Sequence, residues 1–279
     1  MSETSLESKA KQFHSLHTAP EILILPNAWD VASALILAES GFPAIASTSA
    51  GVAFSRGFRD GEQISREEMI AEAGKMAARL DIPVTGDLES GYGIAPEEMA
   101  ETVRQAIDAG LVGCNIEDGT KDGDAPLFDF ALSVERIQAA REAADSAGIE
   151  FVINARTDGF LRMGAGSATL DDAIARANAY YEAGARSLFV PGVSDGQTIG
   201  RLARDIAGPV NILAGPKTPP APELQSLGVA RVSVGGGIAR AAYTTTQRAA
   251  EELRKSGGYG FTENTYSNAE LNALLDAET

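Results

Sequence analysis

The stretch PVTGDLESGYG, residues 83–93, decides the fold: a short apolar strand runs into two carboxylates and then breaks at glycines. Because strand side chains alternate between two faces, Asp87 and Glu89 are predicted to point the same way. Two acids side by side on a buried strand repel each other. A divalent cation that prefers oxygen ligands, such as Mg2+ or Mn2+, relieves that repulsion. A strand end simply wetted by solvent is the alternative explanation for this pair.

Runs of the same kind recur along the chain and end in polar groups. They predict eight strands, at residues 22–27, 44–49, 83–89, 113–118, 151–156, 187–191, 210–214 and 231–235. Segments with helical periodicity lie between them, for example at 66–80, 96–109, 134–147 and 171–183. Strands and helices alternating in this way over about 250 residues predict an α/β fold, a (β/α)8 TIM barrel. A doubly wound open sheet is the alternative, but no Gly-x-Gly-x-x-Gly turn follows the first strand.

In such a barrel the catalytic groups collect at the carboxyl ends of the strands. The polar residues at these positions are Asn27, Asp30, Thr48, Ser49, Asp87, Glu89, Glu117, Asp118, Arg156 and Asp158. Glu117 is the natural third carboxylate beside the pair on 83–89. Arg156 would offer a planar fork to a carboxylate or phosphonate, which indicates a small anionic substrate. A buried salt bridge between Glu117 and Arg156 across the barrel mouth is the alternative.

Four motifs carry a resemblance to a known family: PNAWD at 26–30, DLESGYG at 87–93, NIED at 115–118 and NARTD at 154–158. In order and spacing, from about Leu23 to Arg254, they resemble the isocitrate lyase / phosphoenolpyruvate mutase superfamily. The resemblance implies a Mg2+-bound 2-oxo acid or its enolate, with a C–C or P–C bond cleaved or formed beside it.

The same resemblance implies roles for individual residues. Asp87 and Glu89 would hold the metal largely through water, with Glu117 and Asp60 nearby. Donors on the loop after the second strand would hold the substrate oxyanion, and Arg156 would contact the carboxylate and the group that leaves. The predicted catalytic residues are Asp60, Glu117 and Arg156; the substrate-binding residues are Thr48, Ser49, Ala50, Asp87, Arg156 and Asn211; the metal site is Asp87, Glu89 and Glu117.

Departures from the family pattern leave the substrate open. The loop at 119–129 lacks the cysteine of the isocitrate and methylisocitrate lyases, and Cys114 lies on a strand face opposite Glu117. Gly192 stands where methylisocitrate lyases have glutamate, and the lysine- and asparagine-bearing loop of phosphoenolpyruvate mutase is not recognisable. We predict a Mg2+-dependent lyase that cleaves a C–C bond in an oxaloacetate- or 2-methylisocitrate-like acid. A P–C bond enzyme of the phosphonopyruvate hydrolase or phosphoenolpyruvate mutase type and a non-catalytic 2-oxo acid binder remain as alternatives.

Other features describe the setting of the barrel. The glycine-punctuated segment 51–63 reads as a gating loop. His14 and His17 precede the first strand and are expected on a solvated helix face. The barrel domain with its short leading helix is predicted at 1–256, followed by a C-terminal extension at 257–279. The family resemblance implies that the last barrel helix is exchanged between subunits of a homotetramer, a dimer of dimers.

Composition narrows the partners and the compartment. Asp and Glu number 39 against 23 Lys and Arg, a net charge of −16, which argues against nucleic acid or an acidic membrane surface as a partner. A single cysteine excludes a disulfide framework within the chain. The polar N-terminus has no apolar core of the kind found in signal peptides, so a cytoplasmic enzyme is expected.

Overall fold

The sheet is built from short strands that all pair in parallel with their neighbours. The computed structural model describes residues 5–121 and 124–276. Within these residues the strands are β1 (Leu23–Leu25), β2 (Asn27–Ala28), β3 (Ile45–Ser47), β4 (Val84–Asp87), β5 (Gly113–Glu117), β6 (Val152–Arg156), β7 (Ser187–Phe189), β8 (Val210–Leu213) and β9 (Arg231–Ser233). From β2 to β9 each strand lies beside the next one in sequence, as expected for crossovers through helices.

Two of these segments, β1 and β2, are the halves of the strand predicted at 22–27. Pro26 separates them, since proline has no N–H to donate to a ladder. The first half pairs with β9 and the second half pairs with β3, so the sheet closes on itself. The carbonyl of Pro26 still accepts a hydrogen bond from the Ala46 amide at 3.0 Å. The predicted α/β barrel is therefore confirmed, with its first strand interrupted.

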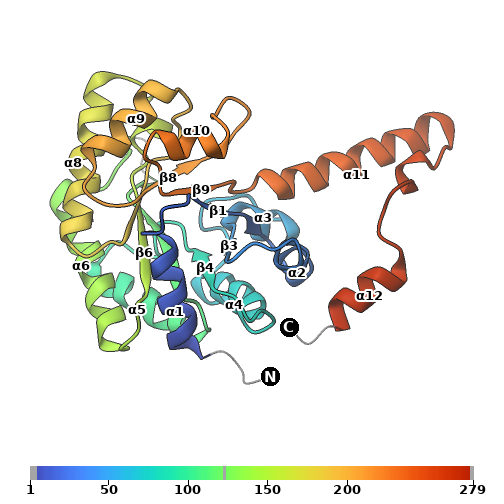
Figure 1. The fold of residues 1–279 in the computed structure, drawn as a ribbon, viewed down its shortest axis with the longest axis horizontal. Coiled ribbons are helices and arrows are strands. Elements are labelled where there is room, and N and C mark those ends of the chain that lie inside the picture. The colour runs from blue at the N-terminus through green and yellow to red at the C-terminus, as the bar shows by residue number, and fades with distance from the viewer. Residues whose placement is uncertain (1–4, 122–123, 277–279) are drawn as a thin grey trace.

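Helices surround the barrel (Figure 1). They are α1 (Leu6–Leu16), α2 (Val31–Glu39), α3 (Ser49–Ser55), α4 (Arg66–Ala77), α5 (Pro96–Asp108), α6 (Phe130–Ser146), α7 (Gly159–Met163), α8 (Ser167–Glu182), α9 (Gly196–Asp205), α10 (Ala221–Ser226), α11 (Gly237–Ser256) and α12 (Asn268–Asp276), with a 3-10 turn at Gly260–Thr262. Local signals set their ends. Ser65 and Glu68 form a reciprocal capping box at the start of α4. Gly184 follows α8 at φ 107°, where a Cβ would lie 2.4 Å from Cγ of Arg141.

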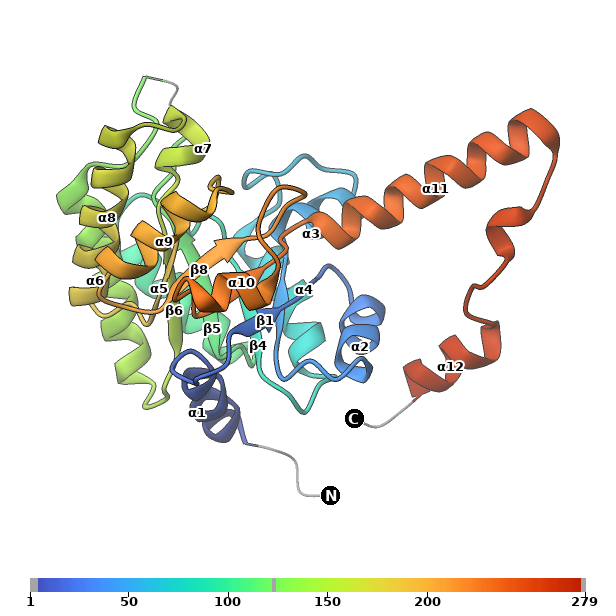
Figure 2. The same cartoon turned by 45° about the horizontal axis from the view of Figure 1, so that its top comes forward.

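Helix α1 closes the amino-terminal end of the barrel, opposite α3 and α7 (Figure 2). Its Ala10 and Phe13 are fully buried and pack with Leu23, Leu25 and neighbouring strand residues. This packing explains why the loops at the other end are the ones left to form a site.

His17, expected on a solvated face, is instead 2% exposed, so that expectation is wrong. Its Nδ1 lies 2.8 Å from the Phe13 carbonyl, an acceptor, so Nδ1 carries the hydrogen. Nε2 therefore accepts from Nη1 of the buried Arg231 at 3.3 Å. Burial and the adjacent guanidinium lower the pKa of His17 to about 3. The helical pattern alone did not reveal this, because the partner lies more than 200 residues away.

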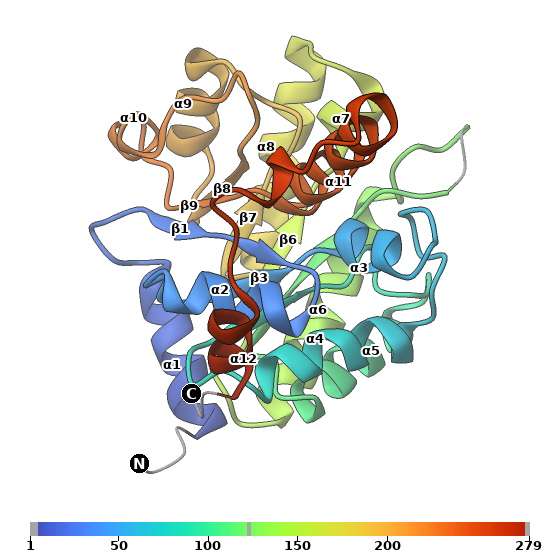
Figure 3. The ribbon, with the colours of Figure 1, turned by 90° about the vertical axis from the view of Figure 1, so that its right-hand side faces the viewer.

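The C-terminal segment leaves the barrel. Helix α11 projects outward, and Ala239 is its one buried residue (Figure 1). The chain then returns so that α12 lies against α2 (Figure 3). On β1 the outward side chain of Ile24 remains 43% exposed between two buried leucines. No helix in the described part of the chain is both long and apolar enough to cross a membrane.

The buried His17 predicts a loss of stability in acid. Folding lowers its pKa from 6.5 to about 3, so the unfolded chain takes up this proton first. The stabilisation from neutral His17 is complete above pH 6.5 and is lost towards pH 3, at about 1.4 kcal/mol per pH unit. His17→Gln removes the titratable group. Between pH 6.5 and 5, urea unfolding should show the wild type losing about 2 kcal/mol more than the variant. Parallel losses in the two proteins would contradict this account.

Candidate active site

Acidic and basic side chains from several strands meet at the carboxyl end of the barrel. Asp87, the last residue of β4, is 8% exposed. One of its carboxylate oxygens, Oδ2, accepts hydrogen bonds from the amide and the hydroxyl of Ser49, both at 3.0 Å. The other, Oδ1, accepts from Nδ2 of Asn115 at 3.2 Å. Donors from β5 and from the start of α3 thus fix the orientation of this carboxylate.

The side chain of Glu89 joins the same acid cluster as Asp87, but its backbone is not part of the strand, contrary to the prediction. β4 ends at Asp87, and Glu89 has a φ of 51°, so strand alternation does not orient it. Its Oε2 accepts from the Glu62 amide at 2.6 Å. Burial, followed by the like charges of Asp60 and Asp87, raises the pKa of Glu89 to about 8. The negative charge in this cluster is therefore poorly compensated by the protein itself.

Glu117 and Arg156 end the neighbouring strands β5 and β6 and are paired in register. Nη1 of Arg156 lies 2.7 Å from Glu117, so the salt bridge considered as an alternative is present. The Nε and Nη2 atoms of Arg156 donate to both oxygens of Asp158, at 2.6 and 3.1 Å. Burial raises the pKa of Glu117 to about 8, although Arg156 opposes the shift. The fork predicted for a substrate is held rigidly by these two acids.

The residues predicted to bind the oxyanion lie at the start of α3. Thr48 is the N-cap of this helix and Ser49 is its first residue, so Gly51–Ser55 of the expected gating loop is helical. The Ser49 hydroxyl also lies 3.2 Å from Oδ1 of Asp60. Since that hydroxyl has one hydrogen, it can donate to only one of Asp60 and Asp87 at a time. Burial and the charge of Asp87 raise the pKa of Asp60.

The remaining predicted positions divide into two groups. Asn211 is fully buried in β8 beside Phe189, which in turn is paired with Arg156, so the register brings Asn211 to the level of the site. Asn27 instead ties the barrel together: its side chain accepts from the Val234 and Gly235 amides and donates to the Ser47 carbonyl. Asp30 caps α2. Asn27 and Asp30 therefore stabilise the fold, and we assign them no contact with substrate.

Three residues that the sequence did not single out complete the site. Glu62, at φ 53°, accepts from the Tyr92 amide at 3.0 Å and pairs with Lys121 at 2.8 Å. Tyr180, from α8, donates to Asp118 at 2.7 Å, and Asp118 accepts from the amide of Asp158. Arg162, from α7, lies 3.3 Å from Asp158. Glu62 and Tyr180 contact partners that are distant in sequence, so no local pattern could have identified them. Arg162 lies four residues after Asp158, and this i,i+4 spacing is the one local signal among the three.

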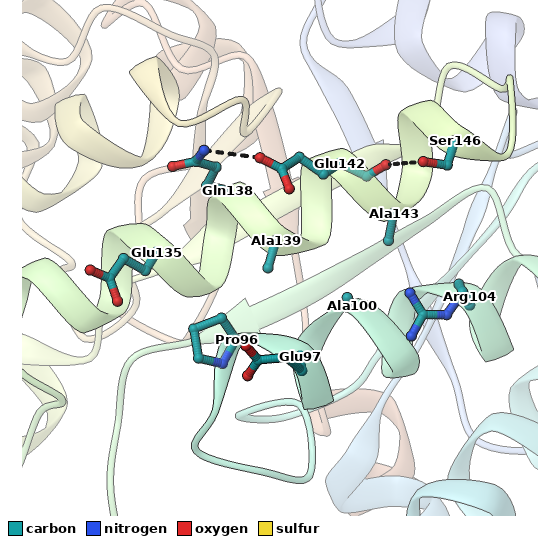
Figure 4. A pocket seen from close by; sticks show the side chains of 10 residues that line it. All are labelled: Pro96, Glu97, Ala100, Arg104, Glu135, Gln138, Ala139, Glu142, Ala143 and Ser146. Carbon is teal, nitrogen blue, oxygen red and sulfur yellow. Dashed lines mark hydrogen bonds between the residues drawn. The ribbon is translucent and has the colours of Figure 1, made fainter.

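Of two hollows of similar volume in the described structure, one adjoins the acid cluster and the other lies on the outer surface between two helices. A hollow of about 550 Å³ adjoins the acid cluster at Glu62 and Ser90 and extends along the loops after β4 and β5. A second hollow of about 550 Å³ lies between α5 and α6, where Figure 4 shows the side chains of Glu97 and Glu142 among those lining it. None of the acid-cluster residues lines this second hollow. Cys114 is fully buried, as predicted for a packed residue.

Comparisons with known proteins agree with this geometry. The sequence profile of the family described as phosphoenolpyruvate phosphomutase matches residues 13–254. An uncharacterized Mycobacterium tuberculosis protein is 40% identical over 80% of this chain and 81% of its own length. The 2-methylisocitrate lyase of Bacillus subtilis is 32% identical over 76% of this chain and 68% of its own length. A solved structure of a Burkholderia cenocepacia protein, 42% identical, has a TM-score of 0.92 and covers 98% of this chain and 97% of that one.

The fold and the site define the class of this protein, an α/β-barrel enzyme with its polar groups at the carboxyl ends of the strands. The profile match and the lyase relative then show the family: the chain belongs to the phosphoenolpyruvate mutase/isocitrate lyase superfamily. The resemblance carried by the four sequence motifs is confirmed.

Proposed function

We propose that this protein is a Mg2+-dependent lyase that cleaves the C–C bond next to the 2-oxo or 2-hydroxy group of a small di- or tricarboxylate. The observation that carries the proposal is the juxtaposition of a buried, poorly compensated acid pair, Asp87 and Glu89, with the rigid fork of Arg156 at one end of the barrel. A 2-methylisocitrate lyase among the relatives supports the reaction class.

The donor set fits a hard cation held largely through water. In the described residues no three Asp, Glu, His or Cys side chains converge closely enough to bind an ion directly. Asp87 and Glu89 nevertheless provide oxygen ligands, and burial, together with the like charges of Asp60 and Asp87, raises the pKa of Glu89 to about 8. These two residues, with Glu117 nearby, would hold Mg2+ or Mn2+. When bound, the cation supplies Lewis-acid stabilisation of an enolate oxygen.

The protein's own groups would bind and orient the substrate. Arg156 is positioned by Asp158 to hold a substrate carboxylate through charge-assisted hydrogen bonds. Thr48, Ser49 and Ala50, at the start of α3, are the proposed donors to the developing oxyanion, and Ser49 would donate there when its hydroxyl turns away from Asp87. Asn211 would contact the substrate from β8. Glu117, whose pKa is raised to about 8, can carry a proton near neutral pH. Asp60, whose pKa is raised by burial and by the charge of Asp87, is assigned the acid–base work together with Glu117.

P–C bond chemistry is the second candidate. The match to the phosphoenolpyruvate phosphomutase profile favours it, and the Arg156 fork suits a phosphonate as well as a carboxylate. A non-catalytic binder of 2-oxo acids is the third possibility. All three candidate functions include binding of a 2-oxo acid, so only turnover assays can distinguish among them.

The chain is proposed to act as a homotetramer, with 1–256 forming the barrel domain and 257–279 an extension whose last three residues lie outside the described part. Helix α11 has Ala239 as its one buried residue, and Ile24 on β1 is 43% exposed, so we propose that α11 of a partner chain covers the outer face of β1. Sedimentation should then give a tetramer, and Ile24→Glu should shift it to smaller species. A monomeric wild type at micromolar concentration would contradict this proposal.

The reaction class is tested by a turnover panel of oxaloacetate, 2-methylisocitrate, 2,3-dimethylmalate and phosphonopyruvate, each with and without Mg2+. The proposal predicts Mg2+-dependent cleavage of at least one C–C substrate and little turnover of phosphonopyruvate. Preference for phosphonopyruvate would establish the second candidate. Binding of these acids without turnover of any of them would leave the non-catalytic role.

Arg156→Lys distinguishes a substrate clamp from a structural ion pair. Lysine keeps the charge but loses the planar fork. A charge-assisted hydrogen bond contributes about 1.5–3 kcal/mol, so kcat/KM should fall about ten- to a hundredfold. Melting temperature is measured in parallel. If the variant melts earlier yet turns over substrate normally once folded, Arg156 is only a structural partner of Glu117.

A further inference from the structure

A second arginine, Arg162, lies beside Arg156 and contacts the same acids, but it comes from a helix and not from a strand. It lies on the short helix α7, which connects β6 to α8 at the carboxyl end of the barrel (Figure 2). Its Nε is 3.3 Å from Asp158, and its Nη2 is 3.9 Å from Glu117. These are the two acids that also hold Arg156, so the four side chains alternate in charge.

The Arg162 guanidinium is held against the backbone of the β5 loop. Nη1 donates to the Thr120 carbonyl at 2.7 Å. A Cβ on Gly119 would lie 2.3 Å from Nη2 and 2.4 Å from Nε, so the absence of a side chain there lets the guanidinium lie close to the chain. Arg162 is therefore fixed in position by a carbonyl and a glycine as well as by acids.

The two arginines differ in depth. The side chain of Arg162 is 32% exposed, against 19% for Arg156, so Arg162 lies on the outer side of the pair. Its contact with Glu117 exceeds hydrogen-bond distance, whereas Nη1 of Arg156 is 2.7 Å from the same carboxylate. A substrate with one carboxylate needs one fork. The outer guanidinium is placed for an anionic group on the solvent side of the one that Arg156 holds.

Resting on the proposed function, we propose that Arg162 binds a carboxylate of the substrate that lies beyond the reacting carbon, and so selects acids that carry this distal group over acids that lack it. Arg156 holds the carboxylate near the reacting carbon, and Arg162 holds the one beyond it. Specificity of this kind arises because a substrate without the distal group makes no hydrogen bond to Nη2 of Arg162, which lies 3.9 Å from Glu117.

The test compares two ligands by calorimetry in the presence of Mg2+. Oxalate is a two-carbon dicarboxylate that matches the carboxylate and enolate oxygens of a metal-bound 2-oxo acid, and it has no carboxylate farther along a carbon chain. The dicarboxylate 3,3-difluorooxaloacetate adds a carboxylate farther along the chain. Arg162→Gln should weaken binding of 3,3-difluorooxaloacetate tenfold or more and leave oxalate within twofold. Gly119→Ala, which displaces the guanidinium, should produce the same selective loss, and Arg162→Lys an intermediate one.

Arg204→Gln, which removes one charge from the surface helix α9, is the matched control and should change neither affinity. Melting temperatures establish that each variant is folded; if Arg162→Gln is not, Gly119→Ala and Arg162→Lys decide the matter. Equal weakening of both ligands, or of neither, would overturn the assignment of Arg162. A wild type that fails to bind oxalate with Mg2+ would reject the proposed function itself and this inference with it.

Discussion

The repulsion between carboxylates gathered at one end of the barrel is the constraint on which the site depends. Parallel strands deliver their carboxyl ends to the same edge, so acids separated by 30 residues in sequence, Asp87 and Glu117, come together. Burial and like charge raise the pKa values of Glu89 and Glu117 to about 8. Donors from Ser49 and Asn115 offset part of this cost, and we propose that a bound cation offsets the rest.

The parallel strands also place an arginine, Arg156, at this end of the barrel, where acidic side chains hold its guanidinium. Both carboxylate oxygens of Asp158 accept from one edge of the Arg156 guanidinium, its Nε and Nη2 atoms. The amide of Asp158 in turn donates to Asp118. Tyr180 then anchors Asp118 from α8, outside the barrel. A chain of hydrogen bonds thus runs from the helical layer to the guanidinium of Arg156. Positioning by such a rigid scaffold is what the proposed role of Arg156 in binding a substrate anion requires.

The sequence predicted the features that depend on local pattern. Apolar runs that end in polar groups and alternate with helical segments identified the strands, and the motifs around Asp87 and Arg156 identified the family. It did not predict the positive φ of Glu89, because a non-glycine residue gives no local sign of a left-handed backbone. Nor did it predict the burial of His17 or the role of Tyr180, since their partners lie on elements brought together only by closure of the barrel.

The central claim, that Asp87 belongs to a cation site, is tested most directly by calorimetric titration of Mg2+ into the wild type and Asp87→Ala. Asp171→Ala, which removes an exposed carboxylate on α8, serves as the control. The account predicts Mg2+ binding in the wild type and in Asp171→Ala, and its loss in Asp87→Ala without loss of the fold. Unchanged Mg2+ affinity in a folded Asp87→Ala protein would contradict it.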